Sequence, residues 1–183
     1  MKRLFFFALA AAAVFAATPF AAGGGAQSSK EAALSDPFIP LADGFLVAGQ
    51  ISPEDVAQAA AEGVTLIINN RPDGEAPGQP KSADIAKAAE AAGLRYVEIF
   101  VDRSGITAAH LDAFDAARAE QTGKTLAFCR TGTRSTTLRS YAAARTGEPV
   151  DQIIAEAAAA GYDLRAHEPA LRALAAVGDA GEE

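Results

Sequence analysis

Short apolar runs alternate with amphipathic, alanine-rich stretches along most of this chain. The apolar runs have the length and β-branched content of strands, and the run 64–69 is continuous enough to be covered on both faces. The stretches between them carry N-cap residues, acidic first turns and closing glycines, which predict helices. The predicted strands are 45–48, 64–69, 95–101 and 125–128, and the predicted helices are 53–61, 82–92, 107–121, 135–145, 150–160 and 168–177.

This alternation of strands and helices predicts an α/β fold with a largely parallel sheet flanked by helices. In such folds, ligands bind beyond the carboxyl ends of the strands. Three polar loops follow strands at this edge: the loop after Asn70, the loop 102–105 and the loop that begins at Cys129. We therefore expect the three loops to lie close together and to form an active site.

The first residues have the pattern of a secretory signal peptide. Two basic residues precede an apolar run, and small residues follow it. Thr18 and Pro19 interrupt the apolar stretch, which makes it short for a membrane span. We expect a periplasmic or secreted protein that is cleaved roughly at 22–26 and keeps no stable membrane span. The expected parts are a signal peptide at 1–22, a flexible segment at 23–37, one domain at 38–177 and a disordered tail at 178–183.

Composition narrows the classes of partner. The formal net charge is -7, which disfavours nucleic acid and anionic membranes. A single cysteine excludes an internal disulfide. His110 and His167 lie far apart without acidic or cysteine neighbours at metal-ligand spacing, so both are expected on helix surfaces, and neither a metal nor another cofactor is expected.

Cys129 is the strongest candidate for chemistry. It opens the run CRTGTRS between a predicted strand and a predicted helix. Backbone N–H groups and the helix dipole stabilise anions at such a place, and nearby arginines lower the pKa of a thiol further. These features predict a nucleophilic thiolate. The alternative is a small buried hydrophobic residue at the end of a strand.

Five runs in order along the chain resemble the beta-lactamase-hydrolase-like family. The runs are INNRPDGE, AAGLRYVEIFVD, SGIT, CRTGTRS and AAGYDL. The resemblance covers about residues 41–171. It implies a cysteine-phosphatase fold of the dual-specificity type, with a domain that is phosphatase-like or sulfurtransferase-like.

Within this resemblance, we expect a sulfurtransferase first. Only four residues separate Cys129 from Arg134, as in a rhodanese loop, whereas phosphatases of this class have five. Phe128 stands where those phosphatases usually carry a histidine. Cys129 would take sulfane sulfur from a small anionic donor, form a persulfide, and pass the sulfur to a thiol acceptor or to cyanide.

Two alternatives stay open. In a phosphatase, Cys129 would attack a phosphate ester and Asp102 would protonate the leaving group, although Asp102 is equally interpreted as a turn residue before Ser104 and Gly105. A non-catalytic module that binds anions or persulfides is the third possibility.

The remaining candidate residues belong to two loops. In the cysteine loop, Arg134 would bind the anion of the substrate, Arg130 would add positive potential, and Gly132 would allow close approach of the backbone. Thr131 and Thr133 would act through their N–H groups, and Ser135 would bind the thiolate or cap the helix. In the loop after the strand 64–69, the candidates are Arg71 and Asp73, either as substrate contacts or through pairing of Arg71 with Asp73 or Glu75.

Overall fold

The computed structural model describes residues 37–179. The predicted signal peptide, all but the last residue of the predicted flexible segment and residues 180–183 of the predicted tail lie outside this range. The strands are β1 (Ile39–Ala42), β2 (Phe45–Ala48), β3 (Val64–Asn69), β4 (Arg95–Glu98) and β5 (Lys124–Phe128). The helices are α2 (Asp55–Ala61), α3 (Ser82–Ala91), α4 (Ala108–Ala119), α5 (Thr133–Arg145), α6 (Val150–Ala159), the short 3-10 helix η1 (Arg165–His167) and α7 (Glu168–Asp179).

The strands form a single sheet in the order β1-β2-β5-β3-β4. β2, β5, β3 and β4 are parallel, whereas β1 pairs antiparallel with β2 at the edge. The predicted largely parallel sheet is therefore confirmed. β1 was not predicted, because a run of four residues that includes Pro40 has little strand signal of its own. Its N-terminal residue lies opposite Val47 of β2, so this strand depends on its neighbour.

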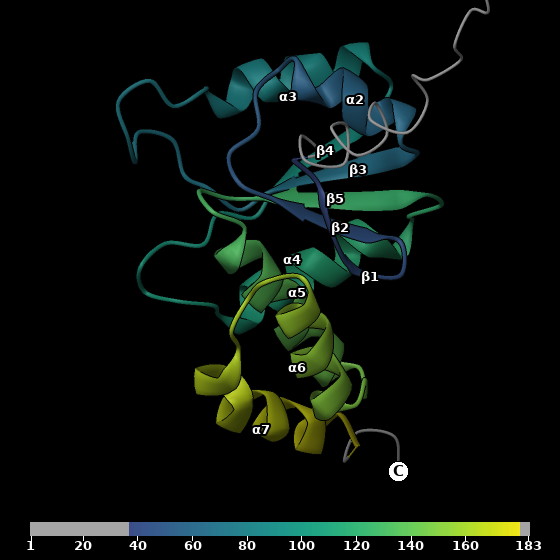
Figure 1. Ribbon diagram of the computed structural model, residues 1–183, viewed down its shortest axis with the longest axis vertical. Helices are drawn as coiled ribbons and strands as arrows, with labels where there is room; N and C mark the ends of the chain where they lie inside the picture. The colour runs from purple at the N-terminus through teal and green to yellow at the C-terminus, as the bar shows by residue number, and fades with distance from the viewer. Residues whose placement is uncertain (1–36, 180–183) are drawn as a thin grey trace, which may run out of the picture. The chain divides into compact units, whose positions relative to one another are not determined.

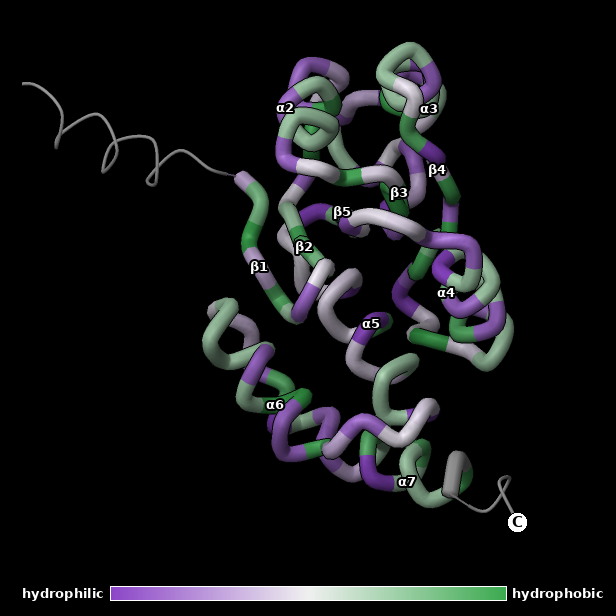
Figure 2. The backbone as a smooth tube through the Cα atoms, turned by 90° about the vertical axis from the view of Figure 1, so that its right-hand side faces the viewer, coloured by the Kyte–Doolittle hydropathy of each residue, from purple (hydrophilic) through white to green (hydrophobic). Residues whose placement is uncertain are grey.

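Helices cover both faces of the sheet, as Figure 1 and the perpendicular view in Figure 2 show. α2 and α3 lie on one face, over a core that includes Ile67, Ile85 and Leu126. α4 and α5 lie on the other face, followed by α6 and α7. α5 is buried along most of its length, because the sheet covers one side and the C-terminal helices cover another. The helix that follows the cysteine loop is thus the centre of the second core.

Several element boundaries differ from the prediction for local reasons. α2 begins at Asp55 rather than 53, and the Asp55 carboxylate accepts a hydrogen bond from the Ser52 N–H at 2.7 Å. β4 ends at Glu98, three residues before the predicted end, although the Ile99 N–H still donates to the Asn69 carbonyl at 2.9 Å. α7 continues to Asp179, beyond the predicted domain end at 177.

Candidate active site

Cys129 lies at the carboxyl end of the central strand β5, where the chain turns into α5. Its residue exposure is 1%, and the Gly132 N–H donates to its Sγ at 3.2 Å. Gly132 is the N-cap of α5 and has a positive φ of 88°, a conformation that glycine adopts at little cost. The strand, the glycine turn and the helix together wrap the backbone around the sulfur.

This wrapping changes the acidity of the thiol. Burial acts to raise the pKa of Cys129, but the backbone N–H groups of Thr131, Ser135 and Arg134 and the Arg134 charge lower it by more. The result is a pKa below the ordinary thiol value, which favours a thiolate. Thr133 is the first residue of α5 rather than a loop residue, and its Oγ1 lies 3.1 Å from the Thr131 Oγ1. The Ser135 hydroxyl is buried without a hydrogen-bond partner, and Gly132 is the N-cap of α5, so neither predicted role of this hydroxyl is seen. Ser135 acts on the thiol through its backbone N–H instead.

Arg134 is fixed by a carboxylate and a carbonyl. Its Nη1 and Nη2 donate to the two carboxylate oxygens of Glu75, each at 2.7 Å, and Nη1 also donates to the Val101 carbonyl at 2.7 Å. The hydrogen bond from Arg134 is the main reason that the pKa of Glu75 falls to about 2. The hydrogen bonds with Glu75, and after them the charge of Cys129, raise the pKa of Arg134. The edge of the guanidinium formed by Nε and Nη2 binds neither Glu75 Oε1 nor the Val101 carbonyl, so it is available to a further anion.

Arg71 is a second arginine that binds the Glu75 carboxylate. It is 3% exposed, its Nε donates to Glu75 at 3.0 Å, and its Nη1 donates to the Gln50 Oε1 at 2.8 Å. The structure therefore shows the predicted pairing with Glu75, and contact of Arg71 with a substrate stays a prediction. From the sequence, Glu75 is expected only as a partner within its own loop; its link to Arg134 spans 59 residues and leaves no local signal.

Asp73 binds the start of α3. Its Oδ1 accepts hydrogen bonds from the Ser82 N–H at 2.9 Å and from the Ser82 hydroxyl at 2.8 Å. A carboxylate that satisfies the first N–H of a helix stabilises the start of that helix. Asp73 thus anchors its loop to α3, and contact of Asp73 with a substrate stays a prediction.

A pocket of about 340 Å³ opens beside the cysteine loop. It brings together residues from all three predicted loops, namely Glu75, Asp102, Arg103, Arg130 and Arg134. Asp102 accepts hydrogen bonds from the Ser104 N–H at 2.8 Å and from the Ser104 hydroxyl at 2.5 Å. These bonds lower the pKa of Asp102 and hold its carboxyl group ionised. The pocket therefore combines the positive charge of three arginines with the Asp102 carboxylate, which forms no ion pair with an arginine among residues 37–179.

Neither histidine lies in this pocket. His110 forms a capping box with Thr107 at the start of α4, and the His167 Nδ1 lies 2.9 Å from the Tyr141 hydroxyl. Within residues 37–179, no group of three or more histidine, cysteine, aspartate or glutamate side chains could hold a metal ion. No helix in the same range is long and apolar enough to cross a membrane.

Comparisons with known proteins support the fold and extend it to a family. Residues 38–146 match the family described as "Beta-lactamase hydrolase-like protein, phosphatase-like domain". A beta-lactamase hydrolase-like protein from Agrobacterium fabrum is 45% identical over 92 residues, which are 50% of this chain and 21% of that protein. The chain thus spans about a fifth of the length of this curated relative.

Solved structures agree with that match. A candidate phosphatase from Neisseria meningitidis is 32% identical, with a TM-score of 0.68, over 76% of this chain and 99% of that chain. A candidate dual-specificity phosphatase from mouse is 18% identical, with a TM-score of 0.59, over 80% of this chain and 91% of that chain, which shows likeness of fold alone. The expected cysteine-phosphatase fold is confirmed, and the chain belongs to the beta-lactamase hydrolase-like family, whose phosphatase-like domain it contains.

Proposed function

We propose that this chain hydrolyses phosphomonoesters by way of a phosphocysteine intermediate. The proposal rests chiefly on one observation: a buried thiol that accepts the Gly132 N–H at 3.2 Å interacts with Arg134, an arginine that the Glu75 carboxylate holds in place. The phosphatase-like family and fold support hydrolysis over the sulfur transfer that we expected first from the sequence.

The reaction follows from these positions. The Cys129 thiolate attacks phosphorus, an S–P bond forms, and the bond between phosphorus and the ester oxygen breaks. The N–H groups of the cysteine loop and the free edge of Arg134 bind the phosphoryl oxygens. Water then attacks the phosphocysteine, which releases inorganic phosphate and restores the thiolate.

Asp102 is the proposed general acid of the first step. Of the two carboxylates that line the pocket, Glu75 is bound to Arg71 and Arg134, so Asp102 is the one free to exchange a proton. Because its bonds to Ser104 lower its pKa, Asp102 must leave Ser104 before it carries a proton to the ester oxygen. The loop 102–105 would therefore rearrange when substrate fills the pocket.

Replacement of Asp102 tests this role. In Asp102→Asn, we expect kcat/KM for alkyl phosphates to fall by about 100-fold or more, because a poor leaving group needs the proton. Aryl phosphates with acidic phenols should lose much less. If Asp102→Asn hydrolysed alkyl phosphates as fast as the wild type does, and aryl phosphates likewise, Asp102 would be a turn residue only.

The reaction type is tested by the adduct on Cys129. Wild-type protein is mixed with an aryl phosphate, quenched in acid and analysed by mass spectrometry of the Cys129 peptide, with Cys129→Ser as the control. We expect a phosphoryl group on Cys129 and none on the serine variant. A parallel incubation with thiosulfate should leave the peptide unchanged.

A sulfurtransferase remains the second candidate because of the spacing of the loop. Four residues separate Cys129 from Arg134, and Phe128 precedes the cysteine. The Cys129 thiolate would take the sulfane sulfur of thiosulfate, release sulfite, and pass the sulfur to a thiol or cyanide. A persulfide in the thiosulfate arm, without phosphorylation in the other, would favour this reaction. Anion binding without either adduct would favour a non-catalytic module.

We also propose that the protein is exported to the periplasm or secreted. The support is the basic start, apolar run and small residues of the first 26 positions. Sequencing of the mature N-terminus should find a chain that begins between residues 22 and 27. Retention of Met1 in protein from the native host would contradict export by cleavage.

A further inference from the structure

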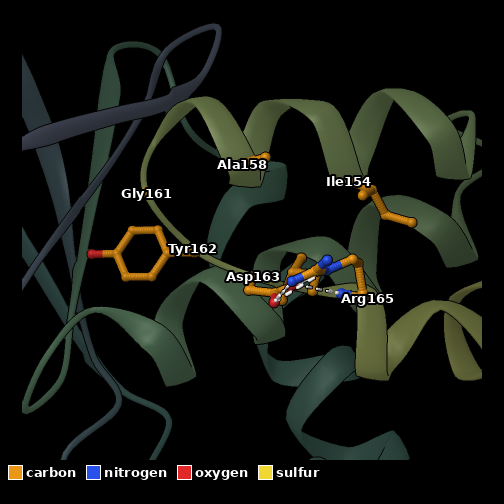
Figure 3. A pocket seen from close by; sticks show the side chains of 7 residues that line it. Ile154, Ala158, Gly161, Tyr162, Asp163 and Arg165 are labelled. Atoms are coloured by element: carbon orange, nitrogen blue, oxygen red, sulfur yellow. Dashed lines mark hydrogen bonds and ion pairs between the residues drawn. The ribbon is translucent and has the colours of Figure 1, made fainter.

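Tyr162 reaches the cysteine loop from the C-terminal part of the chain. It follows α6 and lies outside the segment 38–146 that matches the family. Figure 3 shows its ring turned away from the Asp163–Arg165 ion pair that shares the same pocket. Its hydroxyl donates a hydrogen bond to the Thr131 carbonyl at 3.3 Å. A residue near the end of the chain thus contacts the loop that holds the thiol.

The contact with this loop is close. A Cβ atom placed on Gly132 would lie 2.0 Å from the Tyr162 hydroxyl oxygen and 2.8 Å from the ring carbon that bears it. The phenol therefore occupies the space that any side chain at position 132 would need. The positive φ favours glycine here, and a side chain at this position would also have to displace the tyrosine hydroxyl.

The geometry of the backbone connects the phenol to the sulfur. The Thr131 carbonyl and the Gly132 N–H belong to the same peptide unit and point in opposite directions. Tyr162 binds the carbonyl end, and the Cys129 Sγ accepts from the N–H end at 3.2 Å. A hydrogen bond to the carbonyl polarises the amide and strengthens its N–H as a donor. The three groups form one chain of hydrogen bonds that ends on the thiolate.

This peptide needs such an anchor. A peptide unit next to glycine reverses its direction at low cost, because glycine accepts positive and negative φ about equally. If the 131–132 peptide reversed, its carbonyl oxygen would face the sulfur in place of the N–H and would disfavour the thiolate. The Tyr162 hydroxyl opposes this reversal. Burial and the nearby Cys129 charge raise the pKa of Tyr162, so the phenol keeps the proton that it donates.

We propose that Tyr162 is a positioning residue that locks the Thr131–Gly132 peptide with its N–H toward Cys129 and so keeps the thiol reactive. The proposal rests on the proposed function in taking Cys129 as the nucleophile. It also gives the segment between α6 and α7 a part in the chemistry, beyond its packing against α5.

Tyr162→Phe tests the lock, because it removes the hydroxyl and keeps the ring. The pKa of Cys129 is measured from thiolate absorbance and from the pH dependence of alkylation by iodoacetamide, which require no turnover. We expect this pKa to rise by about half a unit or more, since one hydrogen bond on the route to the thiolate is lost. Hydrolysis of an aryl phosphate should fall at low pH and recover toward the wild-type rate as the pH rises.

Tyr141→Phe is the matched control. It also removes a phenol hydroxyl from the C-terminal half of the chain, one that lies 2.9 Å from the His167 Nδ1 and bonds nothing in the cysteine loop. The pKa of Cys129 should stay unchanged in this variant. An equal shift in both variants would indicate general loosening and would overturn the proposal.

The remaining outcomes separate this proposal from the proposed function. An unshifted pKa of Cys129 in Tyr162→Phe would overturn the positioning role of Tyr162, even if the protein hydrolyses aryl phosphates. A shifted pKa in a protein that hydrolyses no phosphate ester would support the lock and count against the phosphatase. Tyr162→Ala should shift the pKa at least as far, and if that variant fails to fold, Tyr162→Phe decides alone.

Discussion

Single residues in this site act through shared partners. Glu75 receives Arg134 on both of its oxygens and Arg71 on one of them, so one carboxylate orients two guanidinium groups. The Arg71 side chain is buried and also donates to the Gln50 Oε1. The orientation of Arg134 therefore depends on the negative charge of Glu75.

Removal of that charge should affect stability in a pH-dependent way. The pKa of Glu75 falls from 4.5 to about 2 on folding, so its carboxylate stabilises the fold above pH 4.5, and this contribution is lost as the pH falls toward 2. We expect Glu75→Gln to lower the free energy of unfolding by about 1–3 kcal/mol at neutral pH, because the buried Arg71 loses its carboxylate.

Urea unfolding at neutral pH and at a pH near 2 measures this difference. The gap between wild type and Glu75→Gln should close in acid. Asp163→Asn is the control, because Asp163 also has a pKa of about 2 but its ion pair with Arg165 is exposed and does not involve Arg71. A gap that persists unchanged in acid would show that the carboxylate charge is not the source of the effect.

The shape of Arg134 should matter as much as its charge. Arg134→Lys keeps the charge but cannot bind Glu75, the Val101 carbonyl and a phosphoryl group together, because an ammonium lacks the planar fork. We expect kcat for an aryl phosphate to fall by about 100-fold or more. Arg95→Lys is the control. Arg95 begins β4 at the amino end of the strand, away from the carboxyl ends where the site lies, so this variant should keep the wild-type rate. Equal rates in Arg134→Lys and wild type would remove Arg134 from the reaction.

At the scale of elements, one arginine joins α5 to the helix that follows it. Arg139 in α5 donates to Glu148 at 3.0 and 3.1 Å and lies 3.3 Å from the Glu156 carboxylate in α6. The Arg139 side chain is 9% exposed. A buried cation between two partly buried carboxylates is costly to remove, because the carboxylates then repel each other without compensation.

Arg139→Ala should therefore destabilise the protein by about 3 kcal/mol, measured by thermal and denaturant unfolding. Arg172→Ala is a matched comparison, since Arg172 also pairs with two carboxylates on the C-terminal helices, Asp151 and Glu168, but is solvent-exposed. Its change should be much smaller. Similar losses in the two variants would contradict the role given to burial.

At the scale of the whole molecule, the C-terminal helices complete both the core and the site. Apolar residues from α6 to α7, among them Ile153, Leu164 and Leu171, are buried in the same core as residues of the sheet and α5. Tyr162, between these helices, contacts the cysteine loop. The segment matched by the family ends at residue 146, before all of these contacts.

We expect a chain that ends at Gly147 to lose cooperative folding, because α5 would expose the apolar face that α6 and α7 cover. Circular dichroism during heating and the dispersion of amide proton signals measure this loss. A chain that ends at Asp179 should unfold like the full-length protein, since α7 is retained. A sharp unfolding transition in the shorter chain would show that the sheet and α5 are sufficient.

Sequence patterns predicted the parts of the fold that depend on neighbours along the chain. The continuous apolar run of β3 and the capped helix α4 carry their own signals, and Cys129 was identified from the strand, glycine and helix that follow one another. The topology of a parallel sheet then brought three loops to one edge. β1 was missed because its stability comes from pairing with β2 rather than from its own residues.

The sequence by itself determined an α/β sheet, a thiol at a helix entrance and a family. Periodicity, caps and local anion stabilisation are short-range effects that can be read along the chain. The tertiary structure alone decided that Arg71 and Asp73 support loops, that Glu75 holds Arg134, and that Tyr162 contacts the loop of Cys129. Those contacts depend on distances and burial between segments far apart in sequence, which no local pattern of residues specifies.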